Sequence, residues 1–487
     1  MTDRSLPAQP GPAAPTSSAS GAATSGGAAV DGPTADAWQA LGGPAALPER
    51  VSFHGPDTVL PARLPVRRLA RATVAACSLA AAELSALRSG GPVPAVRIDQ
   101  GAVATAFVSE RHLRIDGRAP ASFAPLSGFW PAADGWLRTH ANYPHHRDRL
   151  LTALGLPGDS GPERLAAVLR ELPAAAVQER AYGAGALAVA VAPVRDTVLP
   201  LAEVRVLDGA PPRPLEPAGL PADGVRVLDL TRVIAGPVAG RTLALLGADV
   251  LRIDPPHLPE ADDAHADTGF GRRSTRLDLA DGTDRAVFED LLATADVVVT
   301  GYRPGALDAH GLAPEALIER RPGLVAVQLN AWGWTGPWAG RRGFDSLVQA
   351  GCGIAATEAG ADGRPGVLPA QALDHGTGYL IAAGVLRALT EQRTGRPGGR
   401  RLRFSLAGTA SWLLHGITPT ADPHLPPDDA PDDEPYDEPY DPACRLARTD
   451  SPYGRLRYAL PPVGYEGAPA DWTRPPGRWG TDAPRWR

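Results

Sequence analysis

One stretch of the chain alternates runs of consecutive apolar residues with amphipathic segments. It begins at Gly224 and continues to about residue 330. Four runs are typical of buried strands: VRVLDL (225–230), ADVLRID (248–254), VVVT (297–300) and LVAVQLN (324–330). Three helical patterns lie between them: VAGRTLALLG (238–247), RAVFEDLLATA (285–295) and PEALIERRP (314–322). Because strands that alternate with helices pack as a parallel sheet covered on both faces, the pattern predicts an α/β fold.

The residues before Gly224 show a different pattern, with a longer helix and short alternating strands. TVAACSLAAAELSALRSGG (73–91) predicts a helix that ends at two glycines, and PAVRIDQGAVATAF (94–107) predicts a strand followed by a second helix. Residues 119–195 predict a small α+β domain. Its expected elements are two strands in FWPAADGWLRTH (129–140) and amphipathic helices in HHRDRLLTALGL (145–156) and PERLAAVLREL (162–172).

Segments poor in large apolar residues mark the expected domain boundaries. Residues 1–37 lack the basic and apolar regions of a signal peptide, and their composition predicts a disordered tail. The Pro- and Gly-rich residues 208–223 predict a linker, and residues 421–443, which contain DEPYDEPYD, predict an acidic disordered linker. The remaining expected units are residues 38–207, 224–420 and 444–487, the last with a short hairpin in SPYGRLRYALPPV (451–463).

Composition narrows the class of protein. The chain has 487 residues, more than one ordinary core holds, and its 44% hydrophobic and 21% charged residues are typical of a globular protein. A formal net charge of −6 argues against nucleic acid as a partner. The three cysteines form no closely spaced pair, so neither a metal site nor a disulfide framework is expected. The apolar runs are too short to cross a bilayer, which predicts a cytoplasmic protein without membrane contact.

The first strand–helix–strand unit invites a comparison with dinucleotide-binding folds. Asp254 ends the second predicted strand, where a ribose-binding acid would lie. The loop TRVIAGPVAG (231–240), however, lacks the G-x-G-x-x-G pattern. Pro237 also removes a backbone N–H at a place where a pyrophosphate needs one. The sequence therefore does not favour NAD binding.

Four segments, in order, carry a more specific resemblance. They are VRVLDLTRVIAGPVAGRTLALLGADVLRIDPP (225–256), ADVVVTGYRPGALDAHGL (295–312), LNAWGWTGPWAGRRGFDSLVQAGCG (329–353) and ALDHGTGYLIAAGVLRAL (372–389). Together they resemble the CoA-transferases of family III, the CaiB/BaiF group of formyl-CoA transferases, carnitine CoA-transferases and methylacyl-CoA racemases. The resemblance implies a Rossmann-like parallel sheet with helices on both faces, plus a small α+β domain.

The resemblance also assigns candidate site residues. It implies that Asp374 is the nucleophile that carries the covalent intermediates. It implies contacts to coenzyme A from the backbone of Val233, Ala235 and Gly236 and from the side chains of Arg252 and Arg303. Coenzyme A or acyl-CoA is then a substrate, a carboxylic acid is the acceptor, and no permanently bound cofactor is expected. The backbone N–H groups near Gly376 and Gly378 are candidates for stabilising an oxyanion.

Each candidate also has a structural interpretation. From spacing alone, Asp374 is interpreted as a helix N-cap. From composition alone, Arg303 is a solvated loop arginine and Arg252 caps a strand end. His375 is interpreted as a structural histidine. The family motif before the Arg-Pro-Gly of residues 303–305 usually carries Glu-Asn where this chain has Thr-Gly, so part of its hydrogen bonding to coenzyme A is missing.

The N-terminal half resembles the same family in a rearranged order. Residues 38–207 look like a degenerate partial copy that keeps the small domain, and residues 224–420 look like a copy that lacks it. Residues 75–106 resemble residues 380–410, and this alignment places Leu69 at the position of Asp374. The family forms interlocked homodimers, so we expect either a homodimer or a fused pseudo-dimer in which the halves complete one another.

One position separates the branches of the family. The racemases carry a catalytic histidine immediately before the aspartate that corresponds to Asp345, and this chain has Phe344 there. Because phenylalanine cannot move a proton, the sequence favours CoA transfer over racemisation. The main alternative is a non-catalytic CoA-binding relative, which the rearranged order and the altered motifs suggest.

Overall fold

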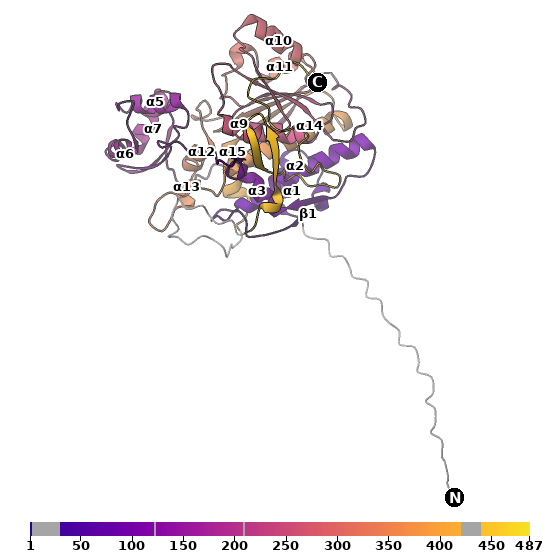
Figure 1. Ribbon diagram of the computed structural model, residues 1–487, viewed down its shortest axis with the longest axis horizontal. Helices are drawn as coiled ribbons and strands as arrows, with labels where there is room; N and C mark the ends of the chain where they lie inside the picture. The colour runs from indigo at the N-terminus through magenta and orange to yellow at the C-terminus, as the bar shows by residue number, and fades with distance from the viewer. Residues whose placement is uncertain (2–29, 121–122, 208–209, 420–439) are drawn as a thin grey trace.

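The computed structural model describes residue 1 and residues 30–120, 123–207, 210–419 and 440–487. Figure 1 shows a large body built around one sheet and a smaller lobe, with helices α5, α6 and α7, at one side of it. Residues 32–37 of the expected tail belong to α1 (Gly32–Ala40), and residues 2–29 lie outside the described residues. The Asp31 side chain caps this helix, and Trp38 at its end is only 1% exposed. The acidic residues 420–439 lie outside the described part of the chain.

A seven-stranded sheet forms the centre of the large body. Its strand order is β10-β9-β8-β11-β12-β13-β7. Six strands are parallel, and β7 pairs antiparallel with β13 at one edge. The strands are β7 (Glu203–Leu207), β8 (Arg226–Leu230), β9 (Asp249–Asp254), β10 (Arg273–Arg276), β11 (Val297–Thr300), β12 (Val325–Asn330) and β13 (Gly399–Ser405). The predicted α/β fold and its four central strands are confirmed.

The two faces of the sheet are covered by different helices. Side chains alternate along β8, so Val227 joins one hydrophobic cluster and Leu228 joins another. The first cluster includes α8 (Ala235–Leu245) and α14 (Ala372–Thr394), and the second includes α10 (Gly282–Leu292) and α11 (Pro314–Arg320). Shorter helices follow the strands: α9 (Asp262–Thr268), α12 (Asp345–Gly351), α13 (Ile354–Thr357), α15 (Leu406–Ser411), the 3-10 turn η2 (Asp308–His310) and the π-helical turn η3 (Trp412–Gly416).

Helix α2 (Val66–Ser89), from the N-terminal half, packs along α14. It ends at Gly90, whose left-handed backbone (φ 70°) closes the helix as predicted. Its length and composition would suffice to cross a membrane, but 83% of its most apolar window is buried inside the fold. The apolar surface of α2 therefore serves as core.

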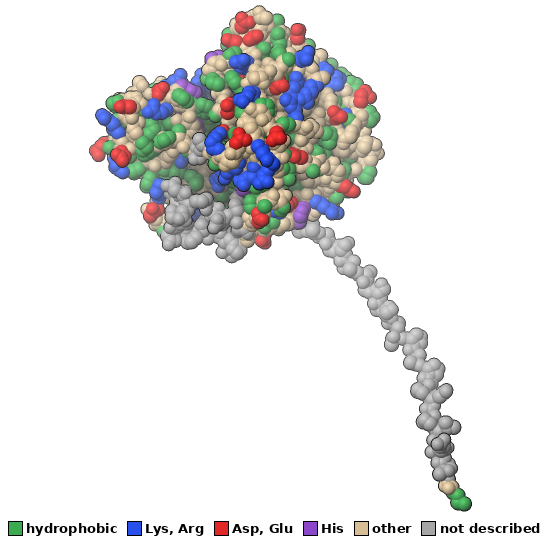
Figure 2. All heavy atoms as spheres, viewed as in Figure 1, with side chains coloured by type: hydrophobic (Ala, Val, Ile, Leu, Met, Phe, Trp, Pro, Cys, Tyr) green, Lys and Arg blue, Asp and Glu red, His purple; other side chains and the backbone are tan. Residues whose placement is uncertain are grey.

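The N-terminal half and the C-terminal segment are joined by strand pairing. The parallel strands β1 (Val51–His54) and β2 (Val96–Asp99) lead into α3 (Gln100–Phe107) and α4 (Ser109–His112). The order α2, β2, α3 matches the order α14, β13, α15, as the predicted repeat requires. The predicted hairpin is present as β14 (Leu446–Ser451) and β15 (Gly454–Ala459), and β15 also pairs with β3 (Arg114–Ile115). Basic side chains gather over this hairpin (Figure 2).

The small lobe is the predicted α+β domain. Three antiparallel strands, β4 (Gly128–Ala132), β5 (Gly135–Thr139) and β6 (Ala188–Ala190), pack with α5 (Pro144–Ala153), α6 (Pro162–Arg170) and α7 (Ala174–Gly183). The lobe has a hydrophobic core of its own, which includes Leu137, Leu150 and Leu165. Two further 3-10 turns, η1 (Leu47–Arg50) and η4 (Ala443–Arg445), complete the described elements.

Glycines let α14 approach its neighbours closely. A methyl group added at Gly378 would lie 2.6 Å from the carbonyl oxygen of Ala235 and 2.8 Å from Cβ of Val238, both in α8. A methyl group at Gly376 would lie 2.9 Å from Cδ2 of Leu69 in α2. The two glycines expected to stabilise an oxyanion therefore have a packing role, inside a helix whose backbone N–H groups bond along its own axis.

Gly378→Ala should destabilise the protein, because backbone atoms and a β-carbon cannot move aside cheaply. We expect a loss of about 1–3 kcal/mol in the free energy of unfolding, measured by urea denaturation. Gly183→Ala is the matched control: its added methyl group meets open space at the end of α7, so its stability should stay equal or rise slightly. Equal stability of both variants would contradict close packing at Gly378.

Candidate active site

Asp374 lies in the first turn of α14 and is 6% exposed. The helix begins two residues earlier, after Gln371, and the Asp374 side chain makes no capping hydrogen bond, so its interpretation as the N-cap was wrong. The acceptor for a backbone N–H in the first turn of α14 comes instead from a different helix, α12. The backbone N–H of Asp374 donates to Oδ2 of Asp345, at the start of α12, over 2.9 Å. The Asp374 carboxylate is thereby left unused by the helix.

Asp345 and Asp374 form a buried pair of carboxyl groups. Burial raises the pKa of Asp374 well above its ordinary value, and the charges of Asp345 and Glu110 raise it further. Burial also raises the pKa of Asp345, although the N–H of Asp374 and the side chain of Gln349 partly offset this. Two carboxyl groups so placed do not easily ionise together. Asp374 is therefore a poorly solvated, reactive carboxylate when it loses its proton.

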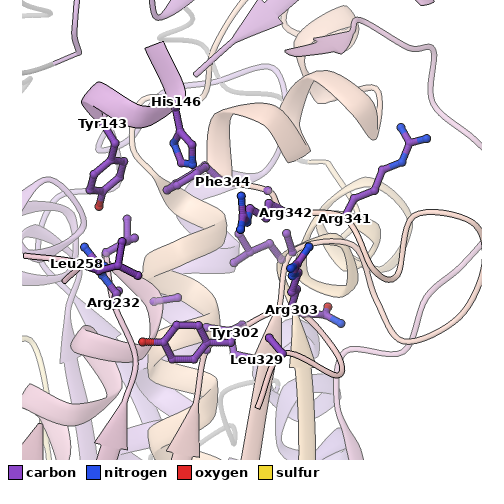
Figure 3. Close-up of a pocket in the computed structure, with 18 of the residues that line it drawn as sticks. Tyr143, His146, Arg232, Leu258, Tyr302, Arg303, Leu329, Arg341, Arg342 and Phe344 are labelled. Atoms are coloured by element: carbon purple, nitrogen blue, oxygen red, sulfur yellow. The ribbon is translucent and has the colours of Figure 1, made fainter. Parts of the chain in front are cut away.

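A cavity of about 540 Å³ opens at Asp374. It lies where the small lobe meets the large body (Figure 3). The small lobe contributes Tyr143, His145, His146 and Arg149, and the large body contributes the other lining residues. Residues from both halves of the chain therefore line the cavity.

Arginine side chains give this cavity a positive charge. Those that line it are Arg149, Arg232, Arg303, Arg341 and Arg342. Arg341 pairs with Glu179 and points away from the cavity centre, whereas Arg303 and Arg342 extend into the same region (Figure 3). Within the described ranges, Arg149, Arg303 and Arg342 have no carboxylate partner. Burial lowers the pKa of Arg342, and the charges of Arg303 and Arg149 lower it further. Such mutual repulsion is relieved by a bound anion.

The structure brings most of the predicted contact residues to this cavity. Val233, Ala235, Arg303 and Asp374 all line it. Val233 has a left-handed backbone (φ 69°), which is a strained conformation for a β-branched residue. Gly236 does not line the cavity. A methyl group there would lie 2.2 Å from the Thr231 side chain, so this glycine permits the tight turn before α8.

Arg252 is placed away from the cavity, which corrects its assignment as a coenzyme A contact. Its guanidinium is fully buried and donates to Asp254 over 2.7 Å and to Glu260 over 3.0 Å. The structure is closer to the alternative in which Arg252 caps the end of a strand, because the guanidinium binds Asp254, the last residue of β9. Asp254, which stands where a dinucleotide-binding fold would carry a ribose-binding acid, is therefore occupied by its ion pair with Arg252.

Glu260 connects Arg252 to the cavity wall. It accepts hydrogen bonds from the hydroxyl of Tyr143 over 3.1 Å and from the backbone N–H of Val233 over 3.4 Å, and its Oε2 lies 3.6 Å from Nε of Arg232. Burial would raise the pKa of Glu260, but the charges of Arg252 and Arg232 outweigh it and lower that pKa. A single buried carboxylate therefore fixes the strained loop at Val233 and holds the small lobe to the large body.

Sequence reasoning missed the cavity residues of the small lobe. They come from YPHHRDR (143–149), of which the sequence pattern predicts only that residues from 145 onward begin an amphipathic helix. The signal that would have found them is the cluster of histidine, tyrosine and arginine at the start of α5. Burial lowers the pKa of His146 to about 3, so its imidazole is neutral at pH 7. Phe344 also lines the cavity and stacks on His140, with ring centres 3.7 Å apart.

Part of the chain is similar in sequence to known CoA-transferases. The model of CoA-transferase family III matches residues 222–441. Acetyl-coenzyme A transferase nodX of Hypoxylon pulicicidum is 36% identical over 210 residues, which are 42% of this chain and 35% of that protein. Acetyl-CoA:oxalate CoA-transferase of Acetobacter aceti is 34% identical over 218 residues, 42% of this chain and 55% of that protein.

Among solved structures, the hypothetical protein Rv3272 of Mycobacterium tuberculosis is 32% identical, with a TM-score of 0.38. The match covers 40% of this chain and 57% of that chain. The chain therefore spans between about one third and just over one half of the length of these proteins.

Glu260→Gln should weaken the contact between small lobe and large body. We expect a loss of about 1–3 kcal/mol at pH 7, measured by urea denaturation, because the amide cannot balance the charges of Arg252 and Arg232. The lowered pKa of Glu260 stabilises the fold above the ordinary pKa of glutamate, and this contribution is lost as the pH falls through the lowered value. The difference from the unsubstituted protein should therefore shrink in acid.

Tyr143→Phe removes only one hydrogen bond to the Glu260 carboxylate. It should lower the free energy of unfolding by about 1 kcal/mol. A Glu260→Gln variant no less stable than Tyr143→Phe would contradict the central position of Glu260.

Proposed function

We propose that this chain moves coenzyme A from an acyl-CoA thioester to a carboxylic acid, with Asp374 as the nucleophile, since the model of CoA-transferase family III matches residues 222–441. One observation carries the proposal: a buried carboxylate lies at a cavity lined by five arginines. The arginines suit the phosphates of coenzyme A and the carboxylate of an acid, and the buried aspartate suits attack on a carbonyl carbon. Coenzyme A acts here as a substrate and not as a resident cofactor.

The first half of the reaction loads coenzyme A onto the protein. The Asp374 carboxylate attacks the thioester carbonyl carbon, a C–O bond forms, and the C–S bond breaks. Coenzyme A leaves as the thiolate, and the acyl group is held as a mixed anhydride. The thiolate then attacks the Asp374 carbonyl carbon of this anhydride. The first acid leaves as a carboxylate, and Asp374 becomes an aspartyl-CoA thioester.

The second half repeats these steps in the opposite direction. The acceptor carboxylate attacks the aspartyl-CoA carbonyl carbon, giving a second mixed anhydride and the thiolate again. The thiolate attacks the acceptor's carbonyl carbon, which releases the new acyl-CoA and restores the Asp374 carboxylate. No net proton is gained or lost. An acid–base group in direct contact with the substrate is therefore not required.

The surroundings of Asp374 support its proposed role as the nucleophile. Burial leaves the carboxylate weakly solvated, which raises its reactivity, and it keeps water from hydrolysing an anhydride. The positive charges of Arg303 and Arg342 favour the binding of coenzyme A and the approach of a second anion. Tyr143 of the small lobe lines the cavity together with Asp374 and donates a hydrogen bond to Glu260, so both halves of the chain take part. The aligned position in the first half is Leu69, so we expect one covalent site per chain.

A second candidate is epimerisation at the carbon next to the thioester. It is favoured by His145 and His146, which line the cavity even though Phe344 stands at the position of the racemase histidine. Incubation of a chiral 2-methylacyl-CoA in deuterium oxide distinguishes the two functions. Racemisation places deuterium on the α-carbon, and CoA transfer does not.

The exchange reaction tests the proposal. With radiolabelled carboxylate and the matching acyl-CoA, the full-length protein should move label into the thioester. Asp374→Asn should lower this rate at least about a thousandfold, because the amide cannot form the anhydride. Asp290→Asn, an exposed substitution in α10, is the matched control and should leave exchange unchanged.

Calorimetric titration with coenzyme A, performed on the unsubstituted protein and on both variants, separates binding from catalysis. Coenzyme A binding without exchange in the unsubstituted protein would identify a non-catalytic CoA-binding relative. Exchange that survives Asp374→Asn would rule out Asp374 as the nucleophile.

A further inference from the structure

Gln349 lies one turn after Asp345 in α12, and both side chains are buried. Its Oε1 accepts the backbone N–H of Leu368 over 3.0 Å, and its Nε2 donates to Oδ1 of Asp345 over 2.5 Å. Because a backbone N–H can only donate, the contact with Leu368 fixes which end of the amide is the carbonyl. The amide NH₂ group is therefore held toward Asp345 as a donor, and it cannot turn round to accept.

The Asp345 carboxyl group receives a donor on each of its oxygens. Oδ1 accepts from Gln349, and Oδ2 accepts from the backbone N–H of Asp374 over 2.9 Å. Hydrogen bonds donated to a carboxylate favour its ionised form. The Asp374 carboxyl group, on the same residue as the second donor, accepts no hydrogen bond within the described ranges. The contacts therefore favour a negative charge on Asp345 and a proton on Asp374.

We propose that Gln349 is a positioning residue: it keeps Asp345 as the ionised member of the buried pair, so Asp374 carries the proton when no substrate is bound. This role of Gln349 rests on the proposed role of Asp374 as the nucleophile. Gln349 is not among the described residues that line the cavity, and it acts on Asp374 through Asp345. The pair then holds one negative charge instead of two, which costs less in a poorly solvated place. Asp374 becomes reactive when this proton passes to water in the cavity that it lines.

The charges around the pair agree with this distribution of the proton. Burial raises the pKa of Asp374 most, and the charges of Asp345 and Glu110 raise it further. Burial also raises the pKa of Asp345, but the hydrogen bonds donated to it oppose this shift. Burial lowers the pKa of Arg138 in β5 to about 10, and the negative charge of Asp345 opposes that change. The remaining titratable or charged groups nearby are His375 in α14 and the cavity arginines named above.

Infrared difference spectroscopy of the full-length protein tests which carboxyl group holds the proton. Labelling with ¹³C-aspartate separates the aspartate bands from those of glutamate. At pH 7 the unsubstituted protein should show the C=O stretch of a protonated aspartate that Asp374→Asn removes. In Asp345→Asn this band should remain in acid but titrate at lower pH, since the neighbouring negative charge is gone. A spectrum that Asp374→Asn leaves unchanged at pH 7 would overturn the proposal.

Gln349→Met tests the positioning role, because it keeps the length of the side chain and removes both hydrogen bonds. The proton equilibrium between the two carboxyl groups should move about fivefold toward Asp345. The band of Asp374 should then weaken and that of Asp345 should grow. Gln392→Met is the matched control: Gln392 is equally a buried glutamine, and it donates to two backbone carbonyls at the far end of α14. Equal spectra for the two methionine variants would overturn the role of Gln349.

The spectra need no turnover, so they give an answer even if the chain is not a CoA-transferase. If the chain exchanges coenzyme A, kcat/KM should rise with pH as Asp374 loses its proton. This rise should occur at lower pH in Gln349→Met than in Gln392→Met, a difference that a loss of stability alone does not produce. The same pH dependence in both variants would contradict the action of Gln349 on the nucleophile.

Discussion

The close approach of α14 to α8 and α2 is the constraint on which the rest of the structure depends. Gly378 lets α14 lie against the start of α8, and Gly376 lets it lie against Leu69 of α2. The contact carries Asp374 to the boundary between the two halves of the chain, where the start of α8 and the small lobe both reach the cavity. It also removes water from the first turn of α14. Burial is the largest cause of the raised pKa of Asp374, so the packing that forms the core also sets the environment of this carboxyl group.

Two carboxylates of the large body organise the charges around this point. Asp345 takes the backbone N–H that an N-cap would otherwise satisfy, and this leaves the Asp374 side chain free for chemistry. Glu260 binds Arg252, Tyr143 and the backbone of Val233, so it fixes both the strained loop and the small lobe. Arg303 and Arg342 are left without carboxylate partners in the described part of the chain, and the cavity keeps a positive charge suited to an anionic substrate.

The sequence predicted the central strands, their helices and the small α+β lobe, because each rests on local pattern. A contiguous motif also singled out Asp374 as the candidate nucleophile, and the structure places this residue at the cavity. It missed β10 and β7, since RSTR (273–276) is polar and EVRVL (203–207) lies alone after a Pro-rich stretch. It misplaced Arg252, because strand position gives no information on which buried acids a guanidinium meets. The contributions of Tyr143 and Glu110 depend on contacts between residues more than a hundred positions apart, and no local pattern encodes such contacts.

The central claim is that Asp374 carries the covalent intermediates. The most direct measurement is peptide mass spectrometry of the full-length protein after incubation with an acyl-CoA and hydroxylamine, which converts an aspartyl anhydride or thioester into a stable hydroxamate. The account predicts a hydroxamate on Asp374 that forms only when acyl-CoA is present, with Leu69 and the other carboxylates unmodified. A hydroxamate on another residue, or sustained CoA transfer with Asp374 unmodified, would contradict it.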